Sequence, residues 1–74
     1  MKLKYILTKN NGPIFFSTLI NHSEMASKFG PATSAGFCQI DNFNGKVECY
    51  GKSVSLGIES DKNDAEIIMR QLSY

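Results

Sequence analysis

Two Asn-Gly pairs, at residues 11–12 and 44–45, constrain the fold of this 74-residue chain more than any other feature. Each pair follows one strand-like run and precedes another. Asn-Gly in that position predicts a β-hairpin, because both residues adopt positive φ at low cost. We expect one hairpin to join residues 5–8 to 13–16 and another to join 37–41 to 46–50. Each connection would contain four residues.

The second hairpin yields a map of its two faces. If Asp41 pairs with Lys46, then Cys38 lies opposite Cys49 and Phe37 lies opposite Tyr50. A type II′ turn at residues 51–52, with glycine first, would add a third strand. The aliphatic and thiol side chains then share one face: Cys38, Ile40, Val47, Cys49, Val54 and Leu56. The other face carries Phe37, Gln39, Asp41, Lys46, Glu48, Tyr50, Ser53 and Ser55.

A short helix is predicted between the two hairpins. Asn21 is a favourable N-cap residue and Glu24 follows three positions later, as in a capping box. The Gly-Pro pair at residues 30–31 is typical of a helix end, so the helix should cover residues 22–29. Met25 and Phe29 would share the face that packs on the core.

A second helix is expected over residues 62–72. It starts after Asp61, acidic residues fill its first turn, and Ala65, Ile68 and Leu72 form one apolar stripe. The order is therefore β-β-α-β-β-β-α. We predict a single α+β domain over residues 1–74, with both helices packed on one face of a small antiparallel sheet. The position of the first hairpin in that sheet is left open.

Composition excludes several classes of protein. The chain is 42% hydrophobic and 20% charged with a formal net charge of +1, unlike a disordered chain. No run approaches the roughly 20 apolar residues of a membrane span, and no signal segment is recognisable, so we expect a cytoplasmic protein. A domain this small leaves little room for desolvated catalytic groups, so we expect no enzyme activity and no cofactor.

The residues suited to metal or nucleophilic chemistry are few. Cys38 and Cys49 are the only cysteines and His22 is the only histidine. They cannot supply a four-ligand zinc site within one chain, so no metal site is predicted. We expect His22 at the surface and the two thiols buried and reduced. Thiol-based redox chemistry at Cys38 and Cys49 remains the second alternative function.

The aromatic residues of the polar face suggest recognition. Phe37 and Tyr50 stand opposite each other among polar neighbours, and Phe43 occupies a hairpin tip, where apolar residues are unusual. Such a pair either stabilises the sheet across its strands or forms a binding platform. Likewise, Phe43 either folds back onto the sheet or anchors a partner. The predicted partner-binding residues are Phe37, Tyr50, Phe43, Gln39 and Ser55.

We therefore predict a small interaction or regulatory module. It would bind another protein, or itself as a homo-oligomer, through an open sheet face or an edge strand. Single-stranded nucleic-acid binding by the same aromatics is the first alternative, with Lys2, Lys4, Lys9 and Lys46 contacting phosphates. It is disfavoured because the aromatic face also carries Asp41 and Glu48.

Overall fold

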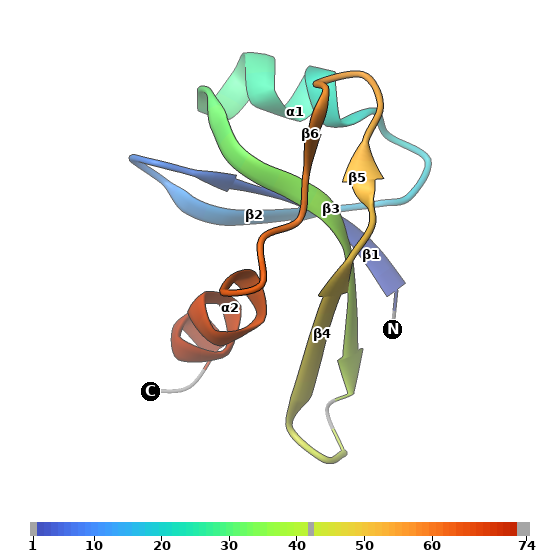
Figure 1. The fold of residues 1–74 in the computed structure, drawn as a ribbon, viewed down its shortest axis with the longest axis vertical. Helices are drawn as coiled ribbons and strands as arrows, with labels where there is room; N and C mark the ends of the chain where they lie inside the picture. The colour runs from blue at the N-terminus through green and yellow to red at the C-terminus, as the bar shows by residue number, and fades with distance from the viewer. Residues whose placement is uncertain (1, 42, 73–74) are drawn as a thin grey trace.

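The computed structural model describes residues 2–41 and 43–72 and shows an α+β fold (Figure 1). The α+β class and the antiparallel sheet expected from the sequence are confirmed. Four strands form the main sheet in the order β2-β1-β3-β4, and β5 pairs separately with β6. The elements are β1 (Lys2–Thr8), β2 (Gly12–Phe16), α1 (His22–Phe29), β3 (Ala32–Asp41), β4 (Lys46–Tyr50), β5 (Lys52–Ser53), β6 (Ile58–Glu59) and α2 (Asp64–Leu72).

The first hairpin belongs to the main sheet. β1 pairs with β2 on one edge and with β3 on the other, so it is a central strand. Thr8 pairs with Gly12, and the connection therefore contains three residues instead of the predicted four. Gly12 adopts a φ of 69°, which a glycine tolerates without strain. The N–H of Asn11 donates to Oγ1 of Thr8 at 3.0 Å and fixes the turn.

The register predicted for the second hairpin is confirmed. β3 and β4 pair Phe37 with Tyr50, Cys38 with Cys49 and Asp41 with Lys46. Because successive side chains on a strand alternate between faces, this register places the thiols on one face and the two aromatics on the other. Asn42, the first residue of the predicted connection, lies outside the described residues.

The prediction that a third strand pairs with the second hairpin was wrong. β5 pairs with β6 and not with β4, placing Lys52 opposite Glu59. The turn forms later than expected because Oγ of Ser53 accepts the N–H of Leu56 at 3.1 Å and the N–H of Gly57 donates to the carbonyl of Ser53 at 2.9 Å. Val54, expected on the apolar face, is 85% exposed in this turn.

The two helices lie on opposite faces of the sheet, whereas the sequence suggested one shared face. Tyr5 and Ile6, adjacent on β1, point to opposite faces and both are fully buried. Tyr5 packs with Cys38 and with Ile68 of α2. Ile6 packs instead with a cluster that includes Met25 of α1. The central strand is apolar on both sides and therefore needs a cover on each face.

The helix boundaries follow the sequence closely. α1 spans the predicted residues, but the side chain of Asn21 makes no capping hydrogen bond. Instead, the N–H of Glu24 donates to the backbone carbonyl of Asn21 at 3.1 Å. Phe29 is exposed at the end of α1 and does not face the core. α2 begins at Asp64, two residues later than predicted. The side chain of Leu72 lies outside the described part of the chain.

A buried hydrogen bond ties α2 to the centre of the sheet. The hydroxyl of Tyr5 donates to Oδ2 of Asp64, and the backbone N–H of Asp61 donates to the same oxygen at 2.9 Å. Both Tyr5 and Asp64 are almost completely buried. Burial, followed by the hydrogen bond to Asp64, raises the pKa of Tyr5 above its usual value. The phenol therefore remains a hydrogen-bond donor at physiological pH.

We expect Tyr5→Phe to lower the free energy of unfolding by about 2 kcal/mol, because it removes a donor from a buried carboxylate. Urea denaturation followed by circular dichroism measures this loss. Tyr50→Phe is the matched control: Tyr50 is 42% exposed, so the loss of its hydroxyl should change stability by less than about 0.5 kcal/mol. Equal effects of the two substitutions would contradict a structural role for the Tyr5–Asp64 bond.

Candidate functional site

Two exposed aromatic residues, Phe43 and Tyr50, lie on the β3–β4 hairpin, which projects beyond the rest of the domain in Figure 1. The rings of Phe37 and Tyr50 stack with their centroids 5.9 Å apart and their planes at 20°. Tyr50 is 42% exposed, so the stack is accessible from one side. We call this region the hairpin surface and define it by Phe37, Gln39, Phe43, Glu48 and Tyr50.

Phe37 forms the base of this surface and is only partly exposed. The His22 ring lies nearly perpendicular to it, with the ring centroids 5.9 Å apart and an interplanar angle of 89°. Nζ of Lys2 lies 5.2 Å from the centre of the Phe37 ring, within the range of a cation–π contact. A Cβ added at Gly51 would come within 3.0 Å of the ring. The packing on several sides fixes the orientation of Phe37.

His22 is buried, which corrects the prediction of a surface histidine. It is 3% exposed, and its Nε2 donates to the carbonyl oxygen of Gly36 at 2.9 Å. A carbonyl only accepts, so Nε2 carries the hydrogen. Phe16 contacts the ring edge-to-face at 5.4 Å, with Phe37 as the other aromatic neighbour. His22 therefore positions Phe37, a role that its sequence neighbourhood did not reveal.

Asp41 holds Phe43 and Asn44 of the hairpin tip through hydrogen bonds. Oδ1 of Asp41 accepts the N–H groups of Phe43 at 3.0 Å and Asn44 at 3.2 Å, and Nδ2 of Asn44 donates to Oδ2 at 2.8 Å. These hydrogen bonds lower the pKa of Asp41, with the Asn44 side chain contributing most. Phe43 is 98% exposed and does not fold back onto the sheet. Phe43 thus presents its ring to solvent while its backbone N–H is bonded to Asp41.

The remaining predicted site residues separate into two groups. Gln39 is exposed on β3, two residues from Phe37, and it joins the hairpin surface. Ser55 does not, because it lies in the β5–β6 turn, where its Oγ is 3.3 Å from Oγ of Ser53. The structure therefore brings four of the five predicted residues onto one hairpin and places Ser55 elsewhere.

The two thiols lie on the other face of the same strands. Cys38 is buried, Cys49 is partly buried, and they form no disulfide. Burial raises the pKa of Cys49 to about 11, although the neighbouring Tyr5 hydroxyl acts in the opposite direction. Burial likewise raises the pKa of Cys38. Both side chains are therefore protonated at neutral pH, which disfavours their use as nucleophiles.

Over residues 2–41 and 43–72, no cluster of three or more His, Cys, Asp or Glu side chains is arranged to hold a metal ion. No helix in this part of the chain has the length and apolar character needed to cross a membrane.

Comparison with known proteins identifies no relative. A scan against protein-family models, a search of curated proteins and a search of solved structures each gave no match. The functional assignment therefore rests on the side-chain geometry of the chain itself.

At about pH 8, we expect iodoacetamide to alkylate Cys49 about a hundredfold more slowly in the folded protein than in urea, because the pKa rises from 9.0 to about 11. Mass spectrometry of the alkylated peptides follows Cys49 separately from Cys38. The stability linked to this shift is present below pH 9.0 and is lost as the pH rises toward 11. Similar alkylation rates in the folded and unfolded states would show that Cys49 is a reactive thiol.

Proposed function

We propose that this chain is a small non-enzymatic module that binds a partner polypeptide through the hairpin surface. The observation that carries the proposal is the pair of exposed aromatics, Phe43 and Tyr50, on one hairpin where Asp41 holds the Phe43 backbone and Phe37 stacks on Tyr50. An exposed Phe43 ring contributes little to folding, because its apolar surface stays in water. Aromatic side chains in such positions dominate the binding energy of many protein interfaces.

The charges around these rings favour a polypeptide over a nucleic acid. The hairpin carries Lys46 and Glu48 on the same face as Tyr50, and Asp41 lies opposite Lys46. Lys2 already contacts the face of the Phe37 ring. A nucleic-acid surface usually concentrates positive charge, whereas this one mixes both signs. Mixed charge around exposed aromatics is the pattern of a protein interface, with a polar rim around apolar anchors.

An edge strand adjoins the hairpin surface. β4 is the last strand of the main sheet, and among the described residues no strand pairs with its outer edge. An extended partner segment can add to such an edge through backbone hydrogen bonds. The opposite edge is less suitable because Pro13 in β2 lacks an N–H group. A strand added at β4 would lie beside Tyr50, and a second copy of this chain is one partner able to supply it.

The test compares Phe43→Ala/Tyr50→Ala with the matched control Leu19→Ala. Leu19 is a large apolar side chain, 92% exposed, and belongs to the β2–α1 connection instead of the hairpin. Self-association is measured by light scattering, and other partners are recovered by affinity capture from the source cells. Phe43→Ala and Tyr50→Ala should each weaken binding by about 30-fold or more. Leu19→Ala should bind normally, and all variants should retain the wild-type circular dichroism spectrum.

Two results would overturn the proposal. If the double variant assembles with the same partners and the same affinity, the hairpin surface is not the interface. If fluorescence anisotropy shows salt-dependent binding of a labelled single-stranded oligonucleotide, and the double variant loses it, the surface recognises nucleic acid instead.

A further inference from the structure

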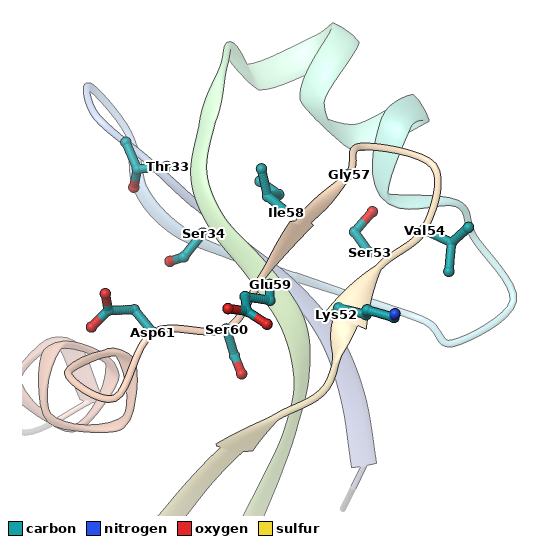
Figure 2. Close-up of a pocket in the computed structure, with 10 residues that line it drawn as sticks. All are labelled: Thr33, Ser34, Lys52, Ser53, Val54, Gly57, Ile58, Glu59, Ser60 and Asp61. Carbon is teal, nitrogen blue, oxygen red and sulfur yellow. The ribbon is translucent and has the colours of Figure 1, made fainter.

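A second surface feature lies outside the hairpin surface. An open pocket of about 620 Å³ is formed by the first residues of β3, by β5 and β6, and by the segment that leads into α2 (Figure 2). Its volume falls within the range of small-molecule sites. Its lining includes the polar and charged residues Thr33, Ser34, Lys52, Glu59, Ser60 and Asp61. None of them belongs to the hairpin surface.

Ser34 is the unusual member of this lining. It is 4% exposed, and its Oγ has no hydrogen-bond partner among the described residues. The neighbouring hydroxyl of Thr33, by contrast, donates to the carbonyl of Leu7 at 3.1 Å. Buried hydroxyl groups are nearly always hydrogen-bonded, so the unpaired Ser34 indicates a missing partner. No hydrogen bond holds Oγ in its present rotamer, so it can turn about χ1 toward a ligand without breaking one.

The charges near Ser34 are mainly negative. In the view of Figure 2, the Ser34 side chain lies between those of Asp61 and Glu59, while the amine of Lys52 extends toward the other side of the β5–β6 hairpin. Neither carboxylate forms an ion pair within the described residues. Asp61 accepts one backbone N–H, from Asn63 at 2.9 Å, which leaves its other oxygen available. This side of the pocket thus offers hydrogen-bond acceptors and negative charge.

We propose that this pocket binds a small molecule through a primary ammonium group. Such a group has three N–H donors and no acceptor, and it matches Ser34, Glu59 and Asp61 in both charge and hydrogen bonding. A quaternary ammonium fits less well, because those ligands are usually held by aromatic rings and this lining contains none. Ca²⁺ also fits less well, since it requires about six to eight oxygen ligands and usually several carboxylates. This site is additional to the proposed protein-binding function.

The experiment is an NMR titration of the full chain with ethanolamine at constant ionic strength. Choline and ethylene glycol are the matched probes: choline keeps the charge and hydroxyl but lacks N–H donors, and ethylene glycol lacks the charge. Ethanolamine should bind in the millimolar range and shift the amide signals of Ser34, Glu59 and Ser60. Choline and ethylene glycol should cause much smaller shifts. Equal shifts with choline, or no ethanolamine shifts in the pocket, would overturn the proposal.

Variants identify the groups responsible. Ser34→Ala breaks no hydrogen bond and should fold normally, yet it should raise the ethanolamine dissociation constant about tenfold. Glu59→Gln should have a similar effect, whereas Glu24→Gln removes an exposed charge on α1 and should have none. Lys52→Gln should tighten binding because it removes a positive charge from the lining. If Ser34→Ala and Glu59→Gln bind like the wild type, or if Lys52→Gln weakens binding, the assignment is wrong.

Discussion

The hydrogen bond between Tyr5 and Asp64 is the constraint on which the arrangement of the domain depends. It joins the central strand β1 to the first turn of α2, across 59 positions of the chain. Asp64 also accepts the N–H of Asp61, so the same carboxylate starts the helix and attaches it to the sheet. A buried carboxylate without these donors would carry a large desolvation cost. The position of α2, and the cover it gives to Cys38 and Cys49, follow from this contact.

On the opposite face, His22 has a comparable role for α1. Its hydrogen bond to the Gly36 carbonyl places the first residue of the helix against β3, and its ring supports Phe37 from the side. Phe37 in turn stacks on Tyr50. The accessible aromatic ring of Tyr50 is therefore connected, through Phe37 and His22, to the interior of the domain. A binding surface supported in this way loses little conformational entropy when a partner docks.

The two proposed binding regions divide β3 between them. Its C-terminal half pairs with β4 and carries the hairpin surface, where aromatic rings are exposed. Its N-terminal half contributes Ser34 to a pocket with hydroxyl and carboxylate groups. The strand beside β3 changes between these two halves. At Gly51, whose φ is 77°, the chain leaves β4 and enters β5. Gly36 permits the crossing, because a Cβ there would lie 2.5 Å from the carbonyl oxygen of Tyr50.

Local sequence determined the parts of this protein whose causes are local. The Asn-Gly pairs and strand alternation gave the β3–β4 register, and hence the Phe37–Tyr50 pair, because a one-residue slip would exchange the two faces. The limits of α1 were predictable from its flanking residues. Three features were not predictable from the sequence: which face of the sheet each helix covers, the burial of His22 and the β5–β6 pairing. Each depends on contacts between distant segments. Ser34 shows the same limit: its sequence neighbours resemble an ordinary strand, and only the tertiary structure leaves its hydroxyl buried without a partner among the described residues.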